Sequence, residues 1–413
     1  MNKKNIIISI SIIIIVSMII ITIMKNDKEI KKIINSSSNY LISIDGASSS
    51  SFPEKGAYDV NIECTNATGE WNYEDWNLEI YNTTGVPVCN INFTTREKQN
   101  LADYIIELSK KAIETNEGTI YEVTNEKGYR YEGKNPKNYI WFNNELWRII
   151  GVFDSNDHGV IVGNIINSGG TSSTNNINLT KIIRNDSIGN IIYDLDENND
   201  WQRSDLFRLL VSNFYNSTDA SNEGTCYQYK NIIQGNCNYE KSGIKPEYRD
   251  MVRNRVSWNV SGGTASSTSS SIYSSERSGA KLTAGFATLT NISVGLMYAS
   301  DYGYSATCVR TTTLDSYDTA TCAGTSWLKK YAREWTMDLD SSSSSTKVLY
   351  INYSGKVASS SATNGYAVRP VVYLHENVEL IGGDGSIYNP YRITYSGSGS
   401  SGGGGTGGGT VTS

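Results

Sequence analysis

Hydrophobic and polar positions alternate with a period of two in many short segments between residues 129 and 393, a pattern typical of strands with one buried face. Two such segments, Tyr139–Phe142 and Leu146–Phe153, flank the pair Asn143 and Asn144. Asparagine tolerates the positive φ angles of a tight two-residue turn. The pattern therefore predicts a β-hairpin.

The rest of this segment predicts more strands and two helices, so the expected fold class is α+β. Further strands are expected at Gly159–Ile166, Ile177–Arg184, Lys347–Tyr353, Lys356–Ala358, Tyr366–Leu374 and Tyr391–Tyr395. Each helix begins at a residue type that favours a helix start. One is capped by Asp200 and carries Leu206, Leu209, Leu210 and Phe214; the other begins at Pro246 and carries Tyr248, Val252 and Val256.

Residues 58–93 predict a separate small β domain, because alternating segments are separated by Asn, Thr and Gly turns. These segments are Tyr58–Cys64, Trp76–Tyr81 and Val88–Phe93. A unit of this size has too little core to be stable alone, so we expect a cross-link to stabilise it.

Residues 94–128 predict a helical spacer. Thr94 and Glu97 have the spacing of a capping box, in which each side chain satisfies a backbone N–H at the helix start. Apolar residues then recur at helical spacing and form one face: Leu101, Ile105, Leu108 and Ala112. We expect this face to pack on a neighbouring domain; a partner-binding helix is the alternative.

A hydrophobic run, Ile6–Met24, lies near the N-terminus. About 17–25 apolar residues suffice for a helix to cross a bilayer. Lysines rather than small residues of a cleavage site follow the run, which favours an uncleaved anchor over a signal peptide. We therefore predict an anchor and juxtamembrane segment over 1–40, a stalk over 41–57 and a Gly/Ser-rich disordered tail over 396–413.

Six cysteines follow this run, and neighbour pairing gives Cys64–Cys89, Cys226–Cys237 and Cys308–Cys322, one of many possible connectivities. Disulfide frameworks persist mainly in oxidising compartments. Lysines are more numerous after the run than before it, which by the positive-inside rule would favour the opposite orientation. The cysteines decide between the two, so we predict a single-pass membrane protein with its C-terminal part outside the cell.

Composition favours an extracellular β-rich binding protein. The 413 residues include 28 Tyr, 8 Trp and 37 Gly but only 6 Pro, and the formal net charge is −6. The charges are spread along the chain without a basic footprint, so a nucleic-acid partner is not expected. The exterior should be neutral-polar and aromatic rather than charged.

Several segments between residues 129 and 393 resemble a group of uncharacterised surface proteins from gut Firmicutes. They are Leu146–Gly151, Asn199–Leu210, Gly295–Tyr304, Ser326–Leu328 and, as the most specific, Gly365–Leu374 (GYAVRPVVYL). The small β domain is similar to units of the same group through Cys64–Gly69, Trp71 and Trp76.

The GYAVRPVVYL ending also resembles the C-type-lectin-like and formylglycine-enzyme-like fold, in which an Arg near the last strand is typical. The resemblance implies a C-type-lectin-like domain over residues 129–395. It supplies no ligand, because the EPN and WND tripeptides of calcium-dependent sugar binding do not occur in the sequence.

One segment has the alternate acidic positions of a calcium loop. Its candidate ligands are Asp194, Asp196, Asn198, Asp200 and Asp205. Against calcium, the sixth position is Asn199 instead of Gly, and Asp200 is also wanted as a helix cap. A solvated loop with a cap is the alternative, and no other cofactor is expected.

Catalytic motifs are not evident. The only histidines, His158 and His375, form no Ser-His-Asp or Cys-His pattern and no CxxC spacing accompanies them as metal ligands. Gly397, Gly399 and Gly402 spell GxGxxG without a strand-to-helix context, so no dinucleotide site is expected.

Aromatic side chains are better candidates for ligand recognition, because a ring offers a large contact area at a low entropy cost. The candidates are Tyr298, Tyr302, Tyr304, Trp327 and Trp335, part of which should instead be core, together with Arg369. Arg369 could bind a ligand carboxylate; alternatively it fixes the fold through a salt bridge or carbonyl contacts.

Three functions remain open at this point. The leading hypothesis is a non-enzymatic, membrane-anchored surface protein that binds a glycan or another surface protein. A second is a variable-ligand display protein, because Ser341–Ser345 and Ser359–Ser361 flank the last hairpin. A third is a surface carbohydrate hydrolase, which would need two carboxylates about 5–10 Å apart in a cleft.

Overall fold

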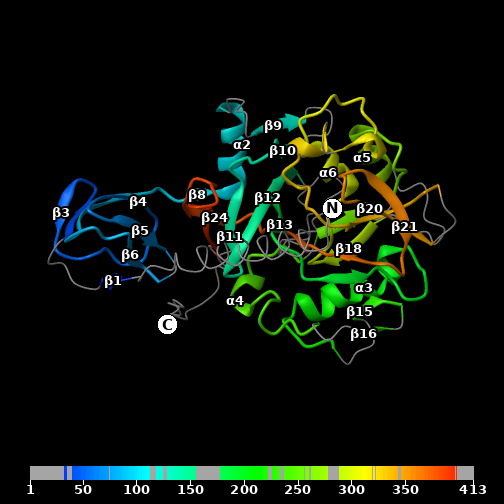
Figure 1. Ribbon diagram of the computed structural model, residues 1–413, viewed down its shortest axis with the longest axis horizontal. Coiled ribbons are helices and arrows are strands. Elements are labelled where there is room, and N and C mark those ends of the chain that lie inside the picture. The colour runs from blue at the N-terminus through cyan, green and yellow to red at the C-terminus, as the bar shows by residue number, and fades with distance from the viewer. Residues whose placement is uncertain are drawn as a thin grey trace, which may run out of the picture. The chain divides into compact units, whose positions relative to one another are not determined.

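The computed structural model (Figure 1) is a mixed α+β structure that consists mostly of strands. It describes residues 32–34, 40–73, 75–111, 118–123, 128–154, 177–221, 226–230, 232–233, 237–254, 256–259, 262–277, 288–318, 320, 322–342, 346–395 and 397. The predicted anchor, the strand at Gly159–Ile166 and nearly all of the tail lie outside these residues. Within them, no helix has both the length and the apolar character to cross a membrane. The chain divides into two compact units, Met1–Glu97 and Lys98–Ser413.

The first unit contains a four-stranded sheet in the order β3-β2-β7-β4 and a three-stranded sheet in the order β1-β6-β5. The strands are β1 (Lys32–Ile34), β2 (Tyr40–Ile44), β3 (Ala47–Ser49), β4 (Tyr58–Thr65), β5 (Thr68–Asn72), β6 (Asn77–Tyr81) and β7 (Val88–Thr95). Their buried apolar residues are Ile42, Trp71, Leu78, Ile80, Cys89, Ile91 and Phe93. Cys64 and Cys89 face each other across β4 and β7 and form the predicted disulfide.

The prediction of a stalk over residues 41–57 is wrong, because β2 and β3 belong to the sheet of the first unit. Strand β2 pairs in parallel with β7 and buries Ile42. Asp45 and Gly46 make the β2–β3 turn with φ angles of 50° and 81°. The alternating apolar positions of this strand outweigh the Ser-rich composition that follows it.

The predicted capping box at Thr94 and Glu97 is also wrong. Thr94 is still in strand β7, and helix α2 (Leu101–Lys111) begins later. The side chain of Asn100 precedes this helix and accepts a hydrogen bond of 3.1 Å from the Asp103 amide. The predicted apolar face exists, since Leu101 and Ile105 are buried in the core of the second unit.

The second unit contains two larger sheets. The first has the order β23-β13-β12-β10-β9, with β11 also paired to β12, and the second has the order β14-β22-β19-β20-β21. The strands of the first are β9 (Thr119–Val123), β10 (Gly128–Glu132), β11 (Tyr139–Phe142), β12 (Glu145–Asp154), β13 (Asn178–Arg184) and β23 (Val371–Tyr373). Those of the second are β14 (Asn190–Ile192), β19 (Glu334–Leu339), β20 (Lys347–Ile351), β21 (Val357–Ser361) and β22 (Gly365–Ala367).

Smaller elements complete the second unit. The short strands are β8 (Gln99–Asn100), β15 (Tyr227–Tyr229), β16 (Ile232–Ile233), β17 (Val256–Asn259), β18 (Thr288–Ile292), β24 (Val378–Gly382) and β25 (Arg392–Tyr395). The α-helices besides α2 are α3 (Asp205–Arg208), α4 (Pro246–Arg249), α5 (Ser269–Arg277) and α6 (Ala299–Tyr304). The 3₁₀ turns are η1 (Trp201–Arg203), η3 (Leu314–Ser316) and η4 (Ala323–Thr325), and η2 (Leu209–Phe214) is π-helical.

The predicted hairpin of the second unit is confirmed. Strands β11 and β12 pair antiparallel, and Asn143 and Asn144 between them have φ angles of 60° and 57°. The last predicted strand, Tyr366–Leu374, is instead two strands in different sheets, β22 and β23. They are separated at Arg369 and Pro370, because proline has no N–H to continue a ladder.

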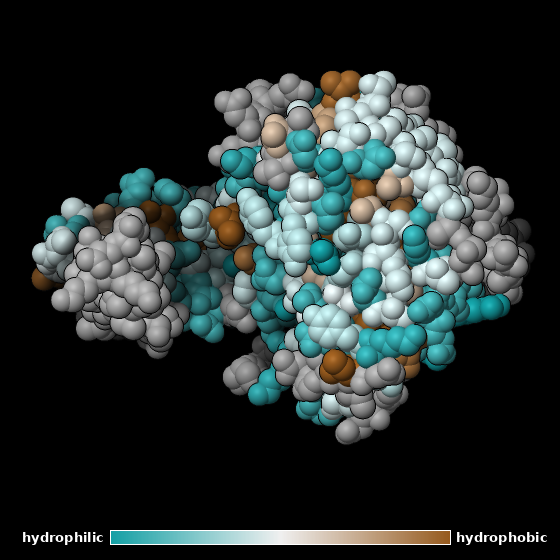
Figure 2. Space-filling model, turned by 45° about the vertical axis from the view of Figure 1, so that its right-hand side comes forward, coloured by the Kyte–Doolittle hydropathy of each residue, from teal (hydrophilic) through white to brown (hydrophobic). Residues whose placement is uncertain are grey.

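The two remaining predicted disulfides, Cys226–Cys237 and Cys308–Cys322, are also formed. Three disulfides indicate an extracellular or otherwise oxidising location. Polar and near-neutral residues cover most of the face shown in Figure 2, and hydrophobic residues form only small separate groups there.

Candidate functional site

Two cations lie on either side of a glycine in the first sheet of the second unit. Arg130 of β10 is opposite Gly151 of β12, and Gly151 is opposite Lys181 of β13. Residues opposite each other on adjacent strands direct their side chains to the same face. A Cβ at Gly151 would lie 2.1 Å from the carbonyl oxygen of Tyr129, so the bulged strand requires glycine here.

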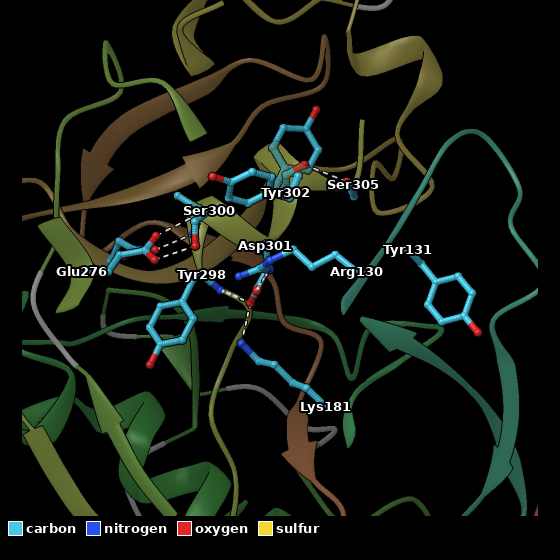
Figure 3. Close-up of polar contacts among 12 residues, drawn as sticks. Arg130, Tyr131, Lys181, Glu276, Tyr298, Ser300, Asp301, Tyr302 and Ser305 are labelled. Atoms are coloured by element: carbon cyan, nitrogen blue, oxygen red, sulfur yellow. Dashed lines mark hydrogen bonds and ion pairs between the residues drawn. The ribbon is translucent and has the colours of Figure 1, made fainter. Parts of the chain in front are cut away.

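Asp301 of helix α6 binds both cations (Figure 3). Its Oδ1 accepts from Arg130 Nη1 at 2.8 Å, and its Oδ2 accepts from Lys181 Nζ at 2.5 Å. All three side chains are at most 2% exposed. Burial alone would raise the pKa of Asp301, but Lys181 and Arg130 outweigh it and lower that pKa to about 2.

Aromatic rings surround this ion pair. The Arg130 guanidinium lies 4.6 Å from the ring centre of Phe153 and 4.9 Å from that of Tyr304. The Lys181 ammonium lies 4.3 Å from the ring centre of Tyr298. Such contacts stabilise a cation that has lost its water, and they leave no exposed atom of the pair for a ligand.

The first turn of α6 is held by three buried carboxylates. Asp301 accepts from the Tyr298 amide at 3.0 Å, Asp338 from the Ala299 amide at 2.6 Å, and Glu276 from the Ser300 amide at 2.9 Å. Figure 3 shows Glu276 reaching Ser300 from the opposite side to Lys181. These N–H groups have no partner within the helix, so each carboxylate satisfies a donor that would otherwise be unpaired. We interpret the Asp301 cluster (Arg130, Lys181 and Asp301) and its neighbours as structural.

None of the three residues of the Asp301 cluster was predicted as a site residue. A signal was present in two places: Lys181 lies between Leu179 and the apolar pair Ile182 and Ile183, and Asp301 lies within the resembling segment Gly295–Tyr304. A charge within a buried strand requires a partner.

The prediction that five aromatic residues form a recognition surface is wrong, because all of them are buried. Their exposed fractions are 3% for Tyr298, 0% for Tyr302, 4% for Tyr304, 3% for Trp327 and 1% for Trp335. Three of them donate to buried carbonyls: Tyr302 Oη to Gly355 O at 2.6 Å, Trp327 Nε1 to Tyr131 O at 2.8 Å and Trp335 Nε1 to Ile191 O at 2.9 Å. Large rings with one polar atom suit a core that offers that atom a partner.

Arg369 confirms the fold-fixing alternative. It is 2% exposed. Its Nε donates to Glu334 Oε1 at 2.5 Å, and its Nη2 donates to Glu334 Oε2 at 3.0 Å and to Leu328 O at 2.7 Å. Its third nitrogen, Nη1, is buried and has no hydrogen-bond partner among the described residues.

The acidic loop uses its carboxylates to accept backbone N–H groups. Asp194 Oδ1 accepts from the amides of Asp196 and Asn198, both at 2.9 Å. Asp200 caps η1 by accepting from Gln202 at 3.1 Å, and Asp205 accepts from Leu195 at 3.0 Å. Asp200 is therefore a cap, but of η1; the helix that carries Leu206, α3, is capped by Ser204, which accepts from the Phe207 amide at 3.1 Å.

A calcium site is not assembled at this loop. Within the described ranges, no group of three or more His, Cys, Asp or Glu side chains is arranged to hold a metal ion. The proposed ligands Asp194, Asp196, Asn198, Asp200 and Asp205 instead follow the course of a turn that leads into a cap.

A second group of cations, which we call the Arg148 cluster, consists of Arg148, Lys330 and Arg369. It has fewer neighbouring carboxylates than the Asp301 cluster. Arg148 is buried between the rings of Tyr139, at 4.1 Å, and Trp327, at 4.6 Å. Its Nε and Nη2 donate to neutral oxygens, Asn138 Oδ1 at 2.7 Å and Pro136 O at 3.2 Å.

Lys330 belongs to the same cluster and is half-buried. Its Nζ donates to Asn185 Oδ1 at 3.3 Å. Burial, then Arg369 and Arg148, lower the pKa of Lys330 to about 8, while Asp186 and Glu334 act in the opposite direction. Of the three cations, Arg369 binds the buried carboxylate of Glu334, whereas Arg148 and Lys330 donate to neutral oxygens.

Two exposed tyrosines belong to this region: Tyr331 follows Lys330 in the sequence, and Tyr353 lies beside Arg333. Tyr331 is 88% exposed and Tyr353 is 60% exposed. The Lys329 ammonium lies 4.8 Å from the ring centre of Tyr331, and the Arg333 guanidinium lies 5.3 Å from that of Tyr353. A Cβ at Gly355 would lie 3.3 Å from the Lys329 side chain, so the β20–β21 turn is adjacent to this segment. We call Lys329, Tyr331, Arg333 and Tyr353 the tyrosine patch.

Comparison with known proteins gave no relative. No protein-family model matches the chain, and neither the curated proteins nor the solved structures contain a match. The function is therefore argued from the residues.

Proposed function

We propose that the protein is a non-enzymatic, membrane-anchored binding protein of the cell surface, and that the unit Lys98–Ser413 is presented to a glycan or protein ligand. The tyrosine patch is the observation that carries this proposal. The patch lies near Trp327 and Trp335, two of the predicted recognition residues. Its exposed rings, however, are those of Tyr331 and Tyr353.

The geometry of the patch suits recognition. Tyr331 and Tyr353 expose most of their surface, and each ring lies beside a cation at about 5 Å. Arg333, which lies beside the Tyr353 ring, is also 5.6 Å from the ring centre of the buried Tyr366. Exposed tyrosine rings offer contact area with little loss of side-chain entropy on binding.

The location at the cell surface has two supports. The three disulfides fit an oxidising compartment. The hydrophobic run Ile6–Met24 has the length of a membrane anchor. The C-type-lectin-like fold is supported by Arg369 between β22 and β23, where that resemblance expects an Arg.

The test is a binding screen with full-length protein purified in detergent, on arrays of glycans and of cell-surface proteins. We expect a ligand whose affinity falls about tenfold or more in the double variant Tyr331→Ala/Tyr353→Ala. Tyr388→Ala is the matched control, because Tyr388 is 87% exposed but lies on the β24–β25 loop. Cleavage of a polysaccharide by the purified protein, or equal losses in the double variant and the control, would overturn the proposal.

A further inference from the structure

We propose that the tyrosine patch binds an acidic saccharide, with a sugar ring on Tyr331 and a carboxylate or sulfate group held by Lys330 and Arg333. This inference rests on the proposed function and names the ligand class of that site. The saccharide would meet the Arg148 cluster from its exposed side, where the half-buried Lys330 lies.

The local charge favours an anion. Three cations, Lys329, Lys330 and Arg333, occur within five residues, in a chain whose formal net charge is −6. The next residue, Glu334, is 2% exposed and is bound by Arg369. Neighbouring charges of one sign at a surface attract ligands of the other sign.

Apart from the two Arg369 nitrogens that bind Glu334, the charged donors of the Arg148 cluster have no carboxylate as a hydrogen-bond acceptor among the described residues. Arg369 Nη1 is buried without a hydrogen bond among the described residues. Arg148 has only neutral oxygens as hydrogen-bond acceptors there, and Lys330 Nζ has a neutral amide oxygen at 3.3 Å. Buried cations that face neutral acceptors carry an electrostatic cost, which a nearby oxyanion would lower.

The rings favour a saccharide over a free inorganic anion. Tyr331 exposes 88% of its surface and Tyr353 exposes 60%. A flat ring at this exposure can pack against the C–H face of a sugar, while its hydroxyl stays in water. Arg333 joins the two kinds of contact, since it lies 5.3 Å from the Tyr353 ring centre and keeps its planar charge for an oxyanion.

The experiment measures binding of full-length protein in detergent to immobilised polysaccharides. Polygalacturonate supplies carboxylates, dextran sulfate supplies sulfates, and neutral dextran is the uncharged reference. We expect binding to at least one acidic polymer and none to dextran. The affinity should fall about tenfold in Lys330→Met and in Arg333→Gln, and about fivefold in Tyr331→Ala.

Controls separate a built site from general attraction between a cation and a polyanion. Lys241→Gln removes an exposed lysine elsewhere, and Tyr388→Ala removes an equally exposed ring; neither should change the affinity. Tyr331→Phe should retain it, because the ring is kept. Thermal unfolding of each variant shows whether a loss of binding reflects loss of the fold.

Each outcome decides something. If Lys241→Gln weakens binding as much as Lys330→Met, or if Tyr331→Ala has no effect, the patch is not the site and the inference fails. If a neutral glycan or a protein binds at Tyr331 instead, the proposed function stands and the acidic-saccharide inference fails. If no array ligand and no polymer binds, both fail.

Discussion

The two buried groups of cations in the second unit differ in how their charge is compensated. In the Asp301 cluster, Arg130 and Lys181 share one carboxylate that is itself fully buried. In the Arg148 cluster, Arg369 alone binds a carboxylate, that of Glu334, and it binds both of its oxygens. Both cations of the first group thus bind a carboxylate, whereas Arg148 and Lys330 of the second group donate to neutral oxygens. Compensation therefore separates a structural charge cluster from a candidate binding site.

The same strand, β12, contributes to both clusters. Gly151 lies between Arg130 and Lys181 of the neighbouring strands, and both cations bind Asp301 of helix α6. Arg148, three positions earlier, lies between Tyr139 and Trp327, whose rings stabilise the charge without neutralising it. Rings lower the cost of burying a cation but supply no negative charge, which an oxyanion near the half-buried Lys330 would add.

The largest effect is expected for Asp301→Asn. The change leaves Arg130 and Lys181 buried without a counter-charge, which typically costs about 3–5 kcal/mol of the free energy of unfolding. Denaturant unfolding of the full chain measures it. Asp196→Asn is the matched control, because Asp196 is exposed. A similar stability of the two variants would show that the cluster does not hold α6 to the sheet.

The pH dependence of stability tests the same cluster. The pKa of Asp301 is lowered from 3.8 to about 2 in the folded state. The ionised group therefore contributes stability above pH 4, on the order of 2 kcal/mol, which is lost as the pH falls from about 4 to 2. Acid unfolding monitored by circular dichroism should show this loss in the wild type. The Asp301→Asn variant should lack that part of the pH dependence.

Removing a charge from the Arg148 cluster should change the free energy of unfolding in the opposite direction from Asp301→Asn. Lys330→Met removes a charge that faces Arg148 and Arg369, with only Asp186 and Glu334 acting in its favour. We expect the free energy of unfolding near pH 7 to rise by about 1 kcal/mol, after allowance for solvent exposure. The pKa of Lys330 is lowered from 10.5 to about 8, so wild-type stability should increase as the pH rises through that interval.

Two controls accompany the Lys330 measurement. Lys241→Met, at an exposed position, should leave stability nearly unchanged. Lys330→Met should gain no further stability between pH 8 and 10. Destabilisation by Lys330→Met comparable to that of Asp301→Asn would mean that the Arg148 cluster is also structurally complete.

Much of the fold could be predicted from local sequence. Two consecutive Asn residues between apolar strands specify the β11–β12 hairpin, and neighbouring cysteines close short loops. The stalk prediction was wrong because Tyr40–Ile44 has apolar residues at every second position, which specify a strand, although a Ser-rich run follows. The split of Tyr366–Leu374 was signalled by Pro370, which cannot donate to a ladder.

The candidate site was less predictable. Strand β19 (EWTMDL) alternates polar and apolar residues, so its pattern places Trp335, Met337 and Leu339 on one buried face. The other face is buried as well, which the alternation does not reveal. Tyr331 and Trp327 are both aromatic and four positions apart, yet one is 88% and the other 3% exposed. Which ring faces water depends on segments distant in the sequence, such as the carbonyl of Tyr131 that Trp327 binds.

The smallest expected effect is stabilisation by a simple oxyanion. Sulfate at 50 mM, compared with chloride at equal ionic strength, should raise the wild-type free energy of unfolding by about 0.5–1 kcal/mol if it binds weakly at Lys330. Sulfate also stabilises proteins generally through exclusion from their surface. The rise in the free energy of unfolding of Lys330→Met is therefore the baseline. The quantity that tests the prediction is the difference between the rise in the wild type and the rise in this variant. Equal rises in both proteins would show that the uncompensated charge near Lys330 attracts no oxyanion, and the distinction between the two clusters would then concern stability alone.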